Sequence, residues 1–312
     1  MVDVKAISTW SDTSVVFVYL RMCIYNILCF PNVVHPKRVP IANPTWYPRA
    51  TVSDINRNVA ENLRYCGPYL VSDTSILDKV VALVTSIIAK KHPCQQEYGA
   101  DEVDQEALDE LSEFDWVVID TALDVISGLA TALGPNFVRL WPVFEKTVYR
   151  YAGSSESIER ANAVGVLAEV ISGMAGAVTP YTGTLLRLLA RRLTDEDSQT
   201  KSNAVYAIGQ LCEKSNANED ITKAYPTILE KLESCMHNPE SNLPDNASGC
   251  ISRMILKHRD HVPVADVLPA LVDILPLKND FEENSPVYRM ICQMCRYFAG
   301  SLLLNHFFLC LF

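Results

Sequence analysis

The chain has 312 residues, of which 49% are hydrophobic and 21% are charged, a composition that indicates a folded globular protein and excludes disordered and collagen-like chains. The chain contains only 12 glycines, too few for Gly-rich phosphate loops and for the frequent tight turns of an all-β protein. We therefore expect a helical protein. The formal net charge of -10 disfavours nucleic acid as a direct partner, because phosphate binding needs a basic surface, and favours a basic protein partner.

The first apolar segment, residues 14–30, is a poor candidate for a membrane span. Arg21 interrupts it, and it is shorter than the roughly 20 residues that cross a bilayer. Because Asp3 and Asp12 precede it, it also lacks the basic start of a signal peptide. The last apolar segment, residues 298–312, is too short as well, so we predict no membrane span.

An acidic run occupies residues 97–115, between a predicted helix over residues 77–91 and another that we expect to begin near Trp116. The run contains no basic residue, and because its charges repel one another we expect a solvated or extended loop. Such a loop would attract a basic partner; the alternative is that it only keeps the protein soluble. Its carboxylates belong to Glu97, Asp101, Glu102, Asp104, Glu106, Asp109, Glu110, Glu113 and Asp115.

Residues 120–290 contain an internal repeat. Asn162, Asn203 and Asn246 are each followed by alanine, at intervals of 41 and 43 residues, which is the period of HEAT repeats. A proline in the preceding segment of three units is a second marker, and the sequence does not decide whether each proline bends a helix or lies in a first turn. These prolines are Pro142, Pro226 and Pro269.

Each repeat is predicted to be a pair of amphipathic helices. Over residues 185–193 leucines recur every three or four positions, with arginines between them, and capping residues at 194–197 indicate the start of the next helix. Since one short pair cannot bury its apolar face, neighbouring pairs must stack, and we predict an all-α HEAT-repeat solenoid. The expected inner-face residues are Ile158, Ala161, Val164, Leu167, Ala168, Ala204, Ala207, Ile208, Leu211, Ala247, Ile251, Met254 and Ile255.

Several smaller features follow near the end of the repeats. Acidic residues at 280, 282 and 283 precede a predicted helix, whose N-terminus they would stabilise without any partner. The histidines at 258 and 261, with the adjacent Lys257 and Arg259, are expected to form an exposed basic helix end. The acidic residues are Asp280, Glu282 and Glu283.

The ten cysteines lie at irregular spacings, which favours reduced thiols and a cytosolic or nuclear protein. Cys292 and Cys295 form an isolated Cys-x-x-Cys pair; because structural zinc needs four ligands, we expect core thiols and no metal site. Walker, GxSxG and HExxH motifs are missing from the sequence, so we predict no catalytic residues, no cofactor and no enzyme activity.

The string ALVDILPLKNDFEE, residues 270–283, resembles the L-P-L-x-x-D-x-E-E turn of the importin-β (karyopherin-β) superfamily of nuclear transport receptors, and most nearly of its importin-4-like members. Residues 245–249, DNASG, are similar too, and the resemblance covers roughly residues 70–296. It implies the C-terminal HEAT-repeat portion of such a receptor. The N-terminal repeats that make the family's main contact with the GTPase Ran have no counterpart in this sequence.

By this resemblance the expected function is that of a nuclear import receptor, or of its C-terminal cargo-binding part. The acidic loop and, as a secondary site, the turn with Asp280, Glu282 and Glu283 would bind basic protein cargo such as histones and ribosomal proteins. Ran and nucleoporins are implied partners, and the protein would move between cytoplasm and nucleus through the nuclear pore. The alternatives are a HEAT-repeat scaffold for a protein complex outside transport and a non-functional truncated product.

The expected domain organisation has three parts. Residues 1–49 carry no repeat signal and are interpreted as a non-repeat, artefactual segment. Residues 50–296 form the solenoid with the acidic loop 97–115, and residues 297–312 are an apolar tail that indicates truncation. Together the two ends suggest a partial gene model or a spliced variant.

Overall fold

The computed structural model describes residues 46–72, 74–92, 95, 105–237 and 242–298. Every regular element in these ranges is a helix, so the all-α prediction is confirmed. The chain divides after Leu133 into two compact units. The apolar segments 14–30 and 298–312 lie outside the described residues, apart from the backbone of Phe298, which ends the last helix.

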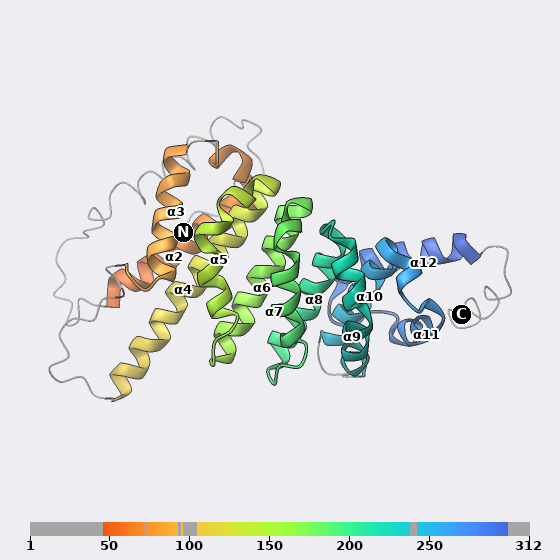
Figure 1. The fold of residues 1–312 in the computed structure, drawn as a ribbon. Coiled ribbons are helices and arrows are strands. Elements are labelled where there is room, and N and C mark those ends of the chain that lie inside the picture. The colour runs from red at the N-terminus through yellow and green to blue at the C-terminus, as the bar shows by residue number, and fades with distance from the viewer. Residues whose placement is uncertain (1–45, 73, 93–94, 96–104, 238–241, 299–312) are drawn as a thin grey trace, which may run out of the picture. The chain divides into compact units, whose positions relative to one another are not determined.

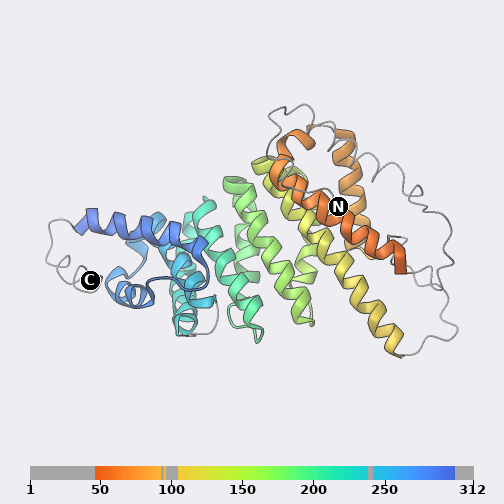
Figure 2. The same cartoon turned by 180° about the vertical axis from the view of Figure 1, so that it is seen from behind.

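The first unit contains α2 (Trp46–Leu70), α3 (Thr74–Ile88) and α4 (Gln105–Leu133). In Figure 2, α2 lies along α4. Two glycines permit this close approach: a Cβ atom at Gly67 would overlap Ala132, and one at Gly128 would lie 3.0 Å from the Ala60 carbonyl oxygen. Both helices therefore depend on a residue without a side chain where they meet.

The second unit is built from eight α-helices with short 3₁₀ segments between them in its described part. Helices α6, α8, α10 and α12 contact one another in series, and Figure 1 shows the same order along the unit. This serial stacking is the arrangement predicted for HEAT repeats. The elements are η3 (Gly134–Arg139), α5 (Trp141–Tyr151), α6 (Ser157–Met174), η4 (Ala175–Tyr181), α7 (Thr182–Arg192), α8 (Ser198–Lys214), α9 (Asn218–Met236), α10 (Leu243–His258), η5 (Arg259–His261), α11 (Val264–Ile274), η6 (Phe281–Glu283) and α12 (Asn284–Phe298).

The predicted inner faces of α6, α8 and α10 are buried, with one exception. Ala204, Ala207, Ile208 and Leu211 of α8 are completely inaccessible, as the periodicity required. Ile158, in contrast, is 56% exposed, so its assignment to the core was wrong. It is the second residue of α6, next to the turn that precedes the helix.

The structure decides between the two placements of the marker prolines. Pro142 lies in the first turn of α5, where its missing N–H costs nothing. Pro226 and Pro269 lie inside α9 and α11, where proline removes one backbone hydrogen bond. One sequence marker therefore has two structural roles.

The repeated asparagines join successive helices. The side-chain nitrogen of Asn203 on α8 donates to the Ala161 carbonyl of α6 at 2.8 Å, and that of Asn246 on α10 donates to the Ser202 hydroxyl of α8 at 2.9 Å. Each asparagine thus bonds to the residue just before the preceding asparagine. The spacing of 41 to 43 residues is therefore the spacing of contacts between stacked repeats.

Candidate functional site

The acidic run is partly helical, which corrects the loop expected over residues 97–115. Helix α4 begins at Gln105, about ten residues before the start that we expected near Trp116. The sequence explains the difference: Ala107, Leu108, Leu111 and Phe114 recur at helical spacing. Acidic side chains are also favourable in a helix's first turns, because they face the positive end of its dipole.

Only part of the predicted cargo site falls within the described residues. Asp115 is half-buried on α4. The backbone positions of four further acids are described in α4, but their side chains lie outside the description, as do four acids before the helix altogether. The four in α4 are Glu106, Asp109, Glu110 and Glu113, and the four before it are Glu97, Asp101, Glu102 and Asp104.

The secondary acidic turn, between α11 and α12, is fixed to α10 by a buried carboxylate. Oδ2 of Asp245 accepts hydrogen bonds from the backbone N–H groups of Lys278, Asn279 and Asp280, at 3.1, 2.6 and 2.8 Å. Asp245 is only 2% exposed. A charged acceptor that receives three backbone donors holds the turn in one conformation.

Glu283 of this turn is part of the protein interior. Its side chain is 1% exposed and forms a two-bond ion pair with Arg253 of α10, which is 7% exposed. Burial raises the pKa of the Glu283 carboxyl, and the Arg253 guanidinium opposes that rise. A Cβ atom at Gly249 would overlap the Glu283 carboxylate, so a glycine is needed there.

The other two acids of the turn are more accessible. Oδ1 of Asp280 accepts the N–H of Glu282 and so caps η6, as the helix-stabilising alternative expected. Glu282 is exposed and Asp280 is half-buried. Only these two of the three predicted acids can therefore meet a partner.

Sequence reasoning missed a polar seam along α10. We define it as Asp245, Gly249, Arg253 and Lys257, which are spaced four residues apart and therefore share one helix face. Arg253 also donates to Glu213 of α8 at 3.2 Å, and Lys257 donates to the carbonyl oxygen of the same residue at 2.8 Å. The four-residue spacing of these residues was the sequence pattern that could have indicated a shared polar face.

Lys257 and His258 do not form the exposed basic end that we expected. Both are half-buried; His258 lies between the hydroxyl of Tyr225, at 2.7 Å from Nδ1, and Oδ1 of Asn218, at 3.0 Å from Nε2. Burial and the neighbouring Lys257 and His261 lower the pKa of His258. These basic residues therefore join α10 to α8 and α9.

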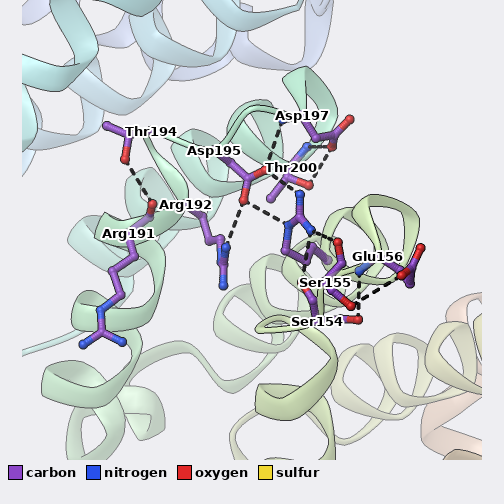
Figure 3. A network of polar contacts seen from close by, with 10 residues as sticks. Ser154, Ser155, Glu156, Arg191, Arg192, Thr194, Asp195, Asp197 and Thr200 are labelled. Carbon is purple, nitrogen blue, oxygen red and sulfur yellow. Dashed lines mark hydrogen bonds and ion pairs between the residues drawn. The ribbon is translucent and has the colours of Figure 1, made fainter.

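A second polar network joins α6 to the turn that precedes α8 (Figure 3). Asp195, in the turn before α8, receives two hydrogen bonds from Arg160 at 2.9 and 3.1 Å and one from Arg192 at 3.0 Å. Burial alone would raise the pKa of Asp195, but these bonds, with one from the N–H of Asp197, lower it below its ordinary value. The network connects the turn before α8 to the first turn of α6.

The Cys-x-x-Cys pair does not belong to the core. Cys292 is exposed and Cys295 is partly exposed, so the expectation of core thiols was wrong for both: α12 buries Val287, Met290 and Met294, and the two thiols fall on other faces of the helix. Among the described residues, no group of three or more potential ligands is arranged to bind a metal.

Two helical stretches have the length and apolar composition of a membrane span, Asp115–Arg139 and Ser157–Arg192. In their apolar windows 67% and 56% of the residues are buried in the protein. Burial of this extent is what core helices of a stacked-helix protein show.

No family model matches the chain. It is 37% identical to the probable importin subunit beta-4 of Schizosaccharomyces pombe over 226 residues, and 28% identical to human importin-4 over 235 residues, which covers 70% and 73% of this chain. Each match covers 21% of the relative, so the chain spans about a fifth of their length, in agreement with the predicted portion of a longer receptor.

A crystal structure of importin beta has a similar fold, with a TM-score of 0.55 at 14% identity over 93% of this chain and 40% of that one. This likeness confirms the HEAT-type solenoid. Together with the two sequence matches, it confirms the resemblance that residues 245–283 suggested.

Proposed function

Because this chain is an importin-4-like member of the importin-β superfamily, we propose that it takes part in nuclear import by binding basic protein cargo. The observation that carries this proposal is the 37% identity to an importin subunit over 70% of the chain. The described part of the second unit supports it, because serially stacked helices supply an extended binding surface. The proposed activity is therefore recognition.

The acidic run is the proposed cargo site. It places nine carboxylates within residues 97–115 without a basic residue, which creates a negative potential that attracts Lys- and Arg-rich segments. The backbone of four of these acids lies in α4. Asp280 and Glu282 form the proposed secondary site; Glu283 is left out because it is buried.

The test uses the full chain and a histone-tail peptide as the basic probe. Replacement of Glu106, Asp109, Glu110 and Glu113 by their amides should weaken binding about tenfold to hundredfold at low salt, since each exposed ion pair contributes about 0.2–1 kcal/mol. The difference should shrink as salt is added. A second variant neutralises Glu97, Asp101, Glu102 and Asp104 in the same way.

The control variant removes the same number of charges elsewhere. It replaces four exposed acids of the second unit by glutamine and should bind the peptide with nearly the affinity of the unmodified chain. Equal weakening in both variants would mean that only net charge matters, and would contradict the site assignment. The control residues are Glu196, Glu219, Glu230 and Glu233.

Addition of GTP-bound Ran and of nucleoporin repeats tests the remaining proposed partners. Displacement of the peptide by Ran indicates a working receptor, whereas binding without displacement indicates a cargo-holding portion that lacks its release module. If no basic peptide binds even at low salt, the HEAT scaffold becomes the better explanation. The proposed location is cytoplasm and nucleus, with passage through the nuclear pore.

A further inference from the structure

The cysteines of α12 differ in accessibility from those of the solenoid core. Of the cysteines whose side chains the structure describes, Cys212, Cys235 and Cys250 are buried, whereas Cys292 is exposed and Cys295 partly exposed. Burial raises the pKa of Cys212 to about 12 and that of Cys250 well above its ordinary value. Because the thiolate is the reactive form, the three core thiols are inert and the α12 pair is accessible to reagents.

The α12 pair has the spacing for an intramolecular bond. Residues three apart in an α-helix have Cα atoms about 5 Å apart, within the range of about 4.4–6.8 Å that disulfides span. Their Cβ atoms lie about 5–6 Å apart, farther than the roughly 3.5–4.5 Å of a relaxed disulfide. The bond can therefore form only if the end of α12 adjusts.

We propose that Cys292 and Cys295 are a reversible redox site whose co-reactant is a small disulfide of the glutathione type. The exposed Cys292 thiolate attacks one sulfur of glutathione disulfide, and the S–S bond breaks to release one glutathione. The Cys295 thiolate then attacks the Cys292 sulfur and releases the second glutathione. Two protein thiols lose two protons and two electrons, which reduce one glutathione disulfide to two glutathiones.

Oxidation is coupled to the contact between α12 and η5. The guanidinium of Arg259 lies 3.5 Å from the centre of the Tyr297 ring, and Tyr297 is two residues beyond Cys295. Distortion of this last turn displaces Tyr297 and weakens the stacking. A strained disulfide is also easily reduced, which is typical of regulatory rather than structural bonds in a reducing compartment.

The experiment exposes the full chain to glutathione buffers of increasing oxidised fraction. Free thiols are then alkylated, and peptides are identified by mass spectrometry. The expected result is a linked Cys292–Cys295 peptide that disappears on reduction, with Cys212, Cys235 and Cys250 unmodified. Hydrogen exchange at the Tyr297 amide should become about tenfold faster in the oxidised protein, since local opening free energies set exchange rates.

A matched control keeps two accessible thiols but changes their spacing. The double variant Cys292→Ser with Gln293→Cys places thiols at 293 and 295, which lie on different sides of the helix, so no intramolecular bond should form. A stable glutathione adduct on Cys292 in the unmodified chain, or no reaction at all, overturns the proposal. A linked peptide without faster exchange at Tyr297 overturns the coupling to η5.

Discussion

The two junctions of α8 solve the same packing problem with different chemistry. Between α6 and α8, the charged contacts lie at the ends of the helices, where Arg160 and Arg192 meet Asp195 in a turn. Between α8 and α10, the charges lie along the length of α10, where Arg253 and Lys257 donate to Glu213 of α8. Arg253 also pairs with the buried Glu283 of η6, at 7% and 1% exposure. In the first junction the ion pairs lie at the ends of the helices, whereas in the second they lie in the middle of α10, inside the core.

This difference affects how much each junction should tolerate change. Both carboxylates are buried, but the arginines that pair with Asp195 are 13% and 24% exposed, whereas Arg253 is 7% exposed. A charge left without its partner costs more where less water can reach it. The polar seam of α10 also requires Gly249 and the three N–H groups bound by Asp245. We therefore expect the seam to be the more sensitive of the two junctions.

The largest effect is expected from Arg253→Met. This variant leaves the Glu283 carboxylate buried and unpaired, and should lower the free energy of unfolding by about 3–5 kcal/mol, measured by urea denaturation. The double variant Arg253→Met with Glu283→Leu removes both charges and should recover most of the loss. Equal instability of the single and double variants would show that packing, rather than charge, makes the seam sensitive.

Gly249→Ala should lower the free energy of unfolding by about 2–3 kcal/mol, because its Cβ atom would overlap the Glu283 carboxylate and force the turn away. Gly183→Ala is the matched control: the nearest atom to its Cβ would be an arginine nitrogen at 3.9 Å. That variant should be neutral or slightly stabilising, since alanine favours helix. The two thermal midpoints, compared in one buffer, check this contrast.

Asp195→Asn tests the junction of α6 and α8 and should cost about 2 kcal/mol at neutral pH, since the partners are only partly buried. The folded-state pKa of Asp195 is lowered, so its stabilisation is complete above the unfolded pKa near 3.8 and is lost as pH falls through the lower folded value. The difference between the variant and the unmodified chain should therefore shrink below about pH 4. A constant difference between pH 7 and pH 3 would contradict this.

The smallest effect is expected from Asp197→Ala. The Asp197 carboxylate accepts the backbone N–H of Thr200 at 2.6 Å and caps α8. Loss of an N-cap costs about 1 kcal/mol. Urea denaturation should detect this decrease, and Asp197→Ser should restore most of it because serine is also a good cap.

Much of the fold follows from local pattern. The leucine periodicity over residues 185–193 and the capping residues before Ser198 predicted α7 and the start of α8, and both were confirmed. The start of α4 differs from the expected one because the apolar residues within the acidic run, at helical spacing, outweigh the repulsion between its charges. Both signals were present in the sequence, and their balance depends on the helix dipole and on packing.

Less of the candidate site could be predicted. The acidic residues of the turn were found, but the burial of Glu283 depends on Arg253, which lies 30 residues earlier. Cys292 and Cys295 were expected in the core because a zinc site would lack two of its four ligands. That argument does not tell which face of the helix meets a neighbour. In the structure α12 packs against α10 and buries Met290 and Met294.

By itself the sequence determined the helix pairs and their 41- to 43-residue period, because hydrophobic spacing and capping act within a few residues of one another. Tertiary structure alone decided which polar residues are buried together, since Arg253 on α10 pairs with Glu283 30 residues later, and Asp245 on α10 binds the backbone of Asn279 34 residues later. A charge enters the core only where a distant partner compensates its loss of water, and no local pattern specifies that partner.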